Sequence, residues 1–180
     1  MVVLQLEEVV KGVLYAVRWE HSEVDCFTEM LDQLDDAEYV HGLLSGKKKD
    51  LFSGFYNYKD VDEAVDAMQE ELNYLTEKIL ECAELSSSDG KDRLRKVFKP
   101  YHNRENAYTF ILSKATAKVR KPILRIYGCR VPSTGCMVLT GYAAKVTRAS
   151  QGDTDTMDQH QKLKIVKKYI KATNFTGQNK

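Results

Sequence analysis

The start of the chain shows the pattern of β-strands. Residues 12–19 are rich in β-branched and aromatic side chains, which predicts a strand there. The mostly apolar residues 3–6 predict a weaker strand before it. After residue 20 the spacing of the apolar positions changes from that of a strand to that of a helix.

Two short helices are predicted next. Over residues 24–34 the apolar positions are spaced by three and four, as on one face of a helix. Ser22 is the expected N-cap, and Asp25 follows it three residues later in a pattern similar to a capping box. A second helix is expected over residues 35–44.

The longest helical pattern follows a predicted loop over residues 46–59. Asp60 and Glu63 match the two ends of a capping box. The apolar seam after them repeats in steps of four and three without a break, and consists of Val61, Val65, Met68, Leu72, Leu75, Ile79 and Cys82. We expect one helix over residues 60–84 that packs within the chain; a dimer through the same seam is the alternative. The serine-rich residues 86–90 form the clearest internal break.

The second half of the chain predicts a sheet and a final helix. Three strands are expected, over residues 108–113, 123–131 and 136–147. The last two form a hairpin around a turn at residues 132–135, in which Cys129 pairs with Val138. Thr156 and Gln159 form a capping box at the start of the final helix.

This order of elements predicts an α+β fold. N-terminal strands and a helical pair are followed by a three-stranded antiparallel sheet and a C-terminal helix. We expect one domain over residues 1–180, with an acidic helical region over about residues 20–85 and a basic sheet half over about residues 91–172.

The formal net charge of +1 hides a strong asymmetry between the two halves. Residues 1–90 hold 7 basic and 21 acidic side chains, a net charge of −14, whereas residues 91–180 hold 20 basic and 5 acidic side chains, a net charge of +15. Such asymmetry indicates contact with nucleic acid or with a membrane surface, and we favour nucleic acid because the basic residues do not lie on one amphipathic helix. The alternative is that the two halves neutralise each other within one fold.

Much of the positive charge lies on predicted strands and their loops. The expected nucleic-acid-binding residues are Lys114, Lys118, Arg120, Lys121, Arg130 and Arg148. Tyr108, Phe110, Tyr127 and Tyr142 are interleaved with them, and aromatic rings can stack on bases. Cations that neutralise phosphates beside such rings predict a surface for single-stranded RNA.

Other patterns narrow the class of protein. The N-terminus lacks the charged start and apolar centre of a signal peptide, and no apolar run approaches the ~20 residues that cross a bilayer. Four scattered cysteines favour reduced thiols, and the histidines show no metal-ligand spacing. We therefore expect a cytoplasmic protein with no membrane, metal or cofactor requirement.

Residues 124–170 resemble the RelE/ParE superfamily of bacterial toxins, and most closely its HigB-like branch. The similarity rests on the strand Leu124-Arg125-Ile126-Tyr127, on the strand Met137 to Thr147 with its Gly141-Tyr142-Ala143-Ala144-Lys145 segment, and on the helix after them. The resemblance implies a RelE-like fold and a metal-independent endoribonuclease, an mRNA interferase of a toxin–antitoxin system. Its implied partners are RNA, either on the ribosome or free, and a cognate antitoxin.

The same resemblance implies which residues act on the scissile phosphate. Arg125 matches the mid-strand arginine of the family and Lys145 its basic residue after the glycine; Tyr142 is the third catalytic candidate. The unbroken hairpin register places Arg125 and Tyr142 on one face and Lys145 on the other, unless a bulge near Gly141 turns the strand. The alternative function is a non-catalytic module of the same fold that binds nucleic acid or protein.

Overall fold

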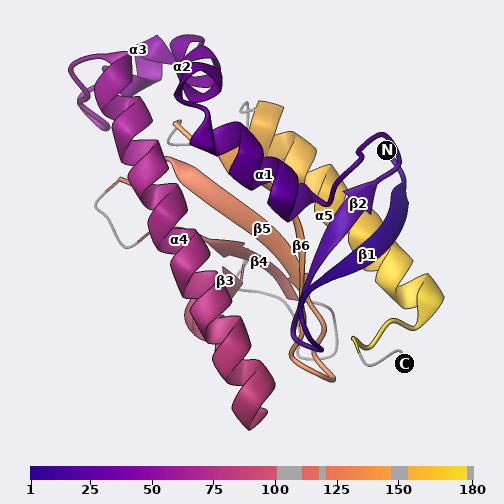
Figure 1. Ribbon diagram of the computed structural model, residues 1–180. Helices are drawn as coiled ribbons and strands as arrows, with labels where there is room; N and C mark the ends of the chain where they lie inside the picture. The colour runs from indigo at the N-terminus through magenta and orange to yellow at the C-terminus, as the bar shows by residue number, and fades with distance from the viewer. Residues whose placement is uncertain (101–110, 118–120, 147–153, 178–180) are drawn as a thin grey trace.

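The computed structural model describes residues 1–100, 111–117, 121–146 and 154–177 (Figure 1). Its strands are β1 (Val3–Val10), β2 (Leu14–Trp19), β3 (Phe98–Pro100), β4 (Ile111–Ala115), β5 (Leu124–Arg130) and β6 (Met137–Ala144). Its helices are α1 (Cys26–Asp35), α2 (Ala37–Ser45), α3 (Lys48–Leu51), α4 (Val61–Asp89) and α5 (Thr154–Thr173), with a 3₁₀ turn, η1, at Leu94–Lys96. The predicted α+β class is confirmed.

The six described strands form one mixed sheet in the order β1-β2-β6-β5-β4-β3. β1 and β2 form an antiparallel hairpin, as the sequence predicts, and residues 14–16 of β2 then pair in parallel with residues 137–139 of β6. The expected three-stranded layout is wrong for two reasons. The N-terminal hairpin joins the sheet through β6, and the short strand β3 extends the opposite edge.

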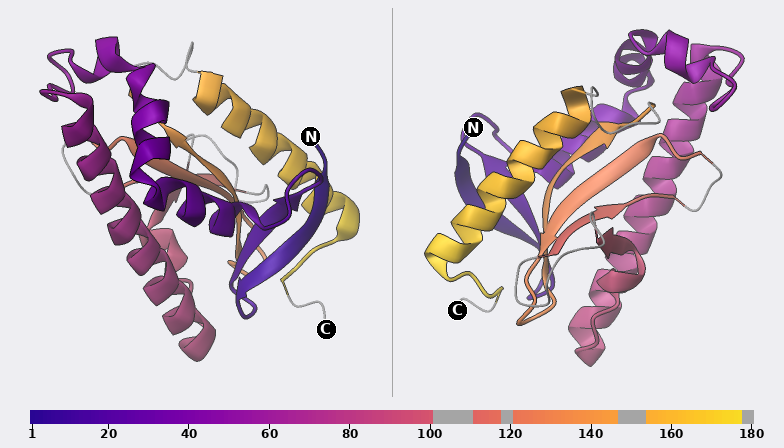
Figure 2. Two further views of the ribbon diagram at one scale, coloured as in Figure 1. Left: turned by 45° about the horizontal axis from the view of Figure 1, so that its top comes forward. Right: turned by 180° about the vertical axis from the view of Figure 1, so that it is seen from behind.

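Helices cover the two faces of the sheet unequally. α1 contacts β2 and β6, and α4 crosses β5 on the same side, which is the near side in Figure 1. α5 packs on the other side against β6 and β5. Seen from behind in Figure 2, α5 runs along the β6 side of the sheet, and β4 lies farther from it than β5 does.

The predicted seam of α4 is the centre of the core. Its residues from Val61 to Ile79 are buried, Cys82 is half-buried, and Ala83 is buried beside it. Asp60 is the N-cap and accepts a hydrogen bond from the Glu63 N–H at 2.8 Å. The Glu63 carboxylate accepts a hydrogen bond from the Lys59 N–H at 2.7 Å, whereas in a capping box it would accept from the N–H of the N-cap residue, Asp60.

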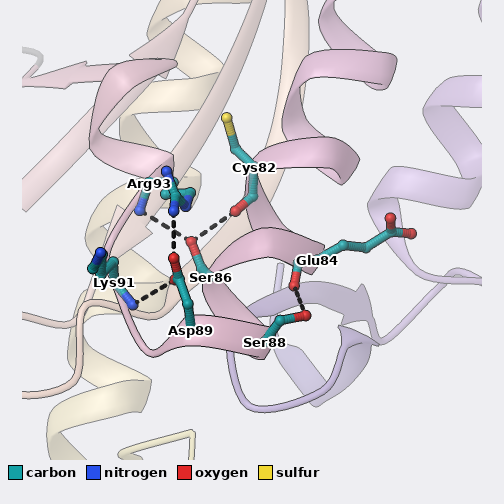
Figure 3. Close-up of polar contacts among 7 residues, drawn as sticks. All are labelled: Cys82, Glu84, Ser86, Ser88, Asp89, Lys91 and Arg93. Carbon is teal, nitrogen blue, oxygen red and sulfur yellow. Dashed lines mark hydrogen bonds and ion pairs between the residues drawn. The ribbon is translucent and has the colours of Figure 1, made fainter.

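α4 continues through the serine run that the sequence marks as a break (Figure 3). The Ser86 and Ser88 hydroxyls donate to backbone carbonyls four residues earlier, at 2.7 and 2.9 Å, so both serines fit within a helix. Asp89 forms an ion pair with Arg93. The helix ends at Gly90, which has a φ of 69° and closes α4 in the left-handed conformation.

Two predicted helix starts differ from the structure, and one short helix was not predicted. Asp25, rather than Ser22, is the N-cap of α1, and its carboxylate accepts from the N–H of Phe27 at 2.8 Å. The short helix α3 lies within the predicted loop of residues 46–59. α5 begins at Thr154, so the expected cap at Thr156 lies inside the helix.

Candidate functional site

A bulge in the β5–β6 hairpin determines which side chains meet. Tyr127 lies opposite Gly141, whereas the next residue, Gly128, lies opposite Leu139. Thr140 is therefore an extra residue on β6, and Gly141 has a φ of 146°, which glycine adopts without strain. In the part of the hairpin nearer the turn, Cys129 lies opposite Val138, as predicted.

The bulge brings two predicted catalytic cations to one face. Beyond it, Arg125 lies opposite Ala143. The N–H of Lys145 donates to the carbonyl of Ile123 at 2.8 Å, which continues the same register. Alternate residues of a strand point to the same face, so Lys145 shares the face of Arg125 and Ala143. The bulge that this arrangement requires is thus present near Gly141.

Tyr142 lies on the opposite face. It pairs with Ile126, and its hydroxyl donates to Gln33 Oε1 at 2.7 Å and lies 3.1 Å from the Tyr39 hydroxyl. The prediction that Tyr142 shares a face with Arg125 is wrong, because a shift of one residue moves every side chain beyond it to the other face.

A third cation joins the face of Arg125 from β4. Lys114 lies opposite Tyr127, two residues along β5 from Arg125, so the three side chains share one face. We call Lys114, Arg125 and Lys145 the basic cluster. All three residues are half-buried, and all three lie on or directly after strands of one sheet, which fixes their backbones.

The basic cluster places three positive charges close together in a partly buried position. Burial lowers the pKa of Lys114, and the positive charges of Arg125 and Lys145 lower it further. Burial also lowers the pKa of Arg125. Cations that are held together and partly removed from water gain strongly from an anion placed between them, because the anion relieves both penalties.

Local contacts fix the positions of two cluster members. The Arg125 Nη1 atom donates to the carbonyls of Pro122 and Leu124, at 2.7 and 3.0 Å. The Tyr56 hydroxyl, from the segment between α3 and α4, donates to the carbonyl of Lys145 at 2.8 Å. The guanidinium is therefore oriented before any ligand arrives, which lowers the entropic cost of binding one.

Glu71 holds the start of β5, the strand that carries Arg125, and the sequence analysis did not identify it. This residue of α4 is only 4% exposed, and its Oε2 atom accepts from the N–H groups of Ile123 and Leu124 at 2.9 and 2.7 Å. Burial raises the pKa of Glu71, while the two N–H groups and the charge of Arg125 oppose that rise. The sequence does hold one signal for Glu71, because this residue directly precedes Leu72 of the apolar seam and therefore lies near the buried face of the helix.

Of the four predicted aromatic residues, the two that the structure describes, Tyr127 and Tyr142, do not form the expected stacking surface. Tyr127 is 1% exposed and packs in a small apolar cluster with Ala143 of β6 and Leu163 of α5. Its ring therefore belongs to the core rather than to a base-stacking face. Tyr108 and Phe110 lie outside the described residues.

The other predicted RNA-binding cations are dispersed. Arg130, at the far end of β5, forms an ion pair with Asp92. Lys121 has its ammonium 5.3 Å from the ring centroid of Phe55, a cation–π arrangement. Three further predicted cations lie outside the described residues: Lys118, Arg120 and Arg148.

Within the described residues, no group of three or more His, Cys, Asp or Glu side chains is arranged to hold a metal ion. In the same part of the chain, no helix has both the length and the apolar character needed to cross a bilayer.

Comparison of the chain with models of known protein families, with curated proteins and with solved structures gives no match.

Proposed function

We propose that the chain is a toxin-like ribonuclease of the RelE/ParE type, which acts on RNA phosphates through the basic cluster. The observation that carries this proposal is the convergence of Lys114, Arg125 and Lys145 on one face of the sheet. The motif resemblance independently singles out two of these residues, Arg125 and Lys145.

The chemistry of metal-independent RNA cleavage suits such a cluster. The 2′-hydroxyl loses its proton and its oxygen bonds to phosphorus, while the bond from phosphorus to the 5′-oxygen breaks and that oxygen takes up a proton. Negative charge builds on the phosphorane oxygens between these events. A fixed guanidinium and two ammonium groups stabilise that charge more than the charge of the ground state, which lowers the barrier.

A non-catalytic RNA-binding module is the second candidate, and the position of Tyr142 favours it. The hydroxyl of Tyr142 bonds to Gln33 and Tyr39 on the opposite face from Arg125, so it is not placed to exchange a proton at the basic cluster. Binding of phosphates needs the cations alone.

The direct test is cleavage of an mRNA by purified protein in the presence of ribosomes. Arg125→Ala and Lys145→Ala should each slow cleavage by about 10²–10³-fold, by analogy with the loss of one oxyanion donor. Expression of the parent should arrest growth, and either variant should relieve the arrest.

Lys164→Ala is the matched control, because Lys164 is an exposed lysine of α5. It should cleave like the parent. A parent protein that neither arrests growth nor cleaves mRNA contradicts the ribonuclease proposal, and RNA binding without cleavage would support the second candidate.

A further inference from the structure

A polar pocket lies between α1 and α5, at the edge of β6 that faces β2. β2 and β6 pair only over residues 14–16 and 137–139, and Figure 1 shows the two strands diverging beyond that point. Residues of α1, α2, α5 and the bulged part of β6 line a cavity of about 440 Å³ there. Cavities of roughly 300–1,000 Å³ accept small organic ligands. We call this cavity the acidic pocket.

Two buried polar atoms in its lining lack partners. Trp19 is 7% exposed and Gln159 is 4% exposed, and both residues line the pocket. Among the described residues, the Trp19 Nε1 donor and the Gln159 Oε1 acceptor find no hydrogen-bond partner. An unpaired buried polar atom costs ~1–3 kcal/mol, so such atoms indicate a missing ligand or water.

The acidic pocket is built around Gln159. A Cβ atom at Gly141 would lie 2.7 Å from Gln159 Oε1, so only glycine at this position leaves room for the amide. The φ of Gly141, 146°, is likewise suited to glycine. The same bulge that aligns Arg125 with Lys145 therefore also creates one wall of the pocket.

The charge of the lining favours a cation. Three carboxylates line the pocket, and two of them have lysine partners: Asp155 with Lys47 at 2.8 Å, and Asp158 with Lys162 at 3.2 Å. The third, Glu29, makes no ion pair and no side-chain hydrogen bond within the described part of the chain.

Lys162 shows that the walls accommodate a positive charge. Its ammonium lies 5.9 Å from the ring centroid of Trp19 and pairs with Asp158, so an indole and a carboxylate already hold one cation. The negative charges of Glu29 and Asp155 also raise the pKa of the buried Tyr142 hydroxyl, after the larger effects of burial and of the Tyr39 hydrogen bond. A negative potential thus extends across the pocket.

We propose that the acidic pocket binds a small organic cation. Its ammonium or guanidinium group pairs with Glu29. Trp19 Nε1 and Gln159 Oε1 are enclosed in this structure, and a shift of the side chains around them lets the body of the ligand accept a hydrogen bond from the first and donate one to the second. This site is separate from the RNA-contacting face, and the inference does not depend on the proposed ribonuclease activity.

The chain supplies its own reporter, because Trp19 is its one tryptophan. The indole N–H resonance of the ¹⁵N-labelled full-length protein therefore reports on the acidic pocket directly. N-acetylargininamide is a suitable probe, since it has a guanidinium group together with amide donors and acceptors. It should shift the resonance saturably, with a Kd of about 1 mM or tighter for a ligand of this size.

Matched controls test each contact of the proposed complex. N-acetylcitrullinamide replaces the guanidinium by a neutral urea of the same shape and should bind the parent protein at least about tenfold more weakly. The Glu29→Gln variant should bind the charged probe more weakly by a similar factor. Gln159→Met should also weaken binding. Asp32→Asn removes the same charge from an exposed position of α1 and should leave the Kd unchanged. Thermal melting establishes that each variant is folded.

Three results would overturn the proposal. The first is the absence of a shift at concentrations well above 1 mM, and the second is equal binding of the charged and neutral probes. The third is a shift caused by an arginine-containing peptide but not by the small probe, which would assign the pocket to a protein side chain instead.

Discussion

At the scale of single residues, the candidate site depends on ionisable side chains whose pKa values are shifted by burial. Lys114 and Arg125 are cations whose pKa values burial lowers, and Glu71 is an acid whose pKa burial raises. Glu71 lies where two N–H groups at the start of β5 need an acceptor. It therefore holds the strand segment from which Arg125 projects.

Glu71 predicts a specific pH dependence of stability. Because its pKa is raised above the ordinary 4.5, the folded state holds the proton more tightly than the unfolded chain does. The contribution of Glu71 to the free energy of unfolding is therefore largest below pH ~4.5 and falls as the pH rises through the folded pKa.

Glu71→Gln keeps an acceptor for the two N–H groups but replaces the carboxyl group, which titrates, by an amide, which does not. The free energy of unfolding of the parent, minus that of the variant, should decrease as the pH is raised from about 4 to 7 in urea titrations. A difference that stays constant or increases over this range contradicts the assignment.

At the scale of elements, the sequence predicts local structure well and long-range pairing poorly. The apolar steps of α4 and the turn between β5 and β6 are local signals, and both predictions are confirmed. The parallel pairing of β2 with β6 joins segments more than 100 residues apart, and no local pattern encodes it. β3 has three residues, too few for a periodic pattern to be recognised.

The same contrast applies to the candidate site. Arg125 and Lys145 could be predicted from a motif, whereas their common face depends on the bulge at Thr140, which the sequence suggests only through Gly141. Tyr142 was placed on the wrong face for that reason. Glu71 was missed because its partners are backbone N–H groups, which leave no trace in the residue pattern.

The α4 seam predicts which face of this helix tolerates charge. Leu72 is 4% exposed within the core, so Leu72→Asp places an unpaired carboxylate there and should lower the free energy of unfolding by about 3–5 kcal/mol. Asn73→Asp adds the same charge one residue later on the exposed face and should change stability by less than about 0.5 kcal/mol. Equal denaturation midpoints for the two variants would show that the seam is not core.

At the scale of the whole molecule, the charge asymmetry of the sequence becomes an asymmetry between the two sides of the sheet. The helices of the acidic half, α1 and α4, pack on one side, and the basic cluster lies on the other. The ion pair of Asp89 with Arg93 joins an acidic side chain of the first half to a basic side chain of the second, so a small part of the charge is neutralised between the halves. Such a separation of charge would orient the molecule toward a polyanion and speed their association.

Contact between the basic cluster and RNA phosphates is the core of the proposed function, and the salt dependence of binding measures this contact. Fluorescence anisotropy would give the Kd of a short single-stranded RNA over a series of salt concentrations for the parent and for the triple variant Lys114→Gln, Arg125→Gln, Lys145→Gln. The control variant, Lys11→Gln, Lys164→Gln, Lys168→Gln, removes the same charge from exposed positions away from the basic cluster.

Each phosphate contact contributes about 0.7 to the slope of log K against log salt for a single strand. The cluster variant should therefore have a slope shallower than that of the parent by about 2. The control variant should keep most of the parental slope. An absence of binding at low salt, or an equal loss of slope in the two triple variants, would contradict the claim.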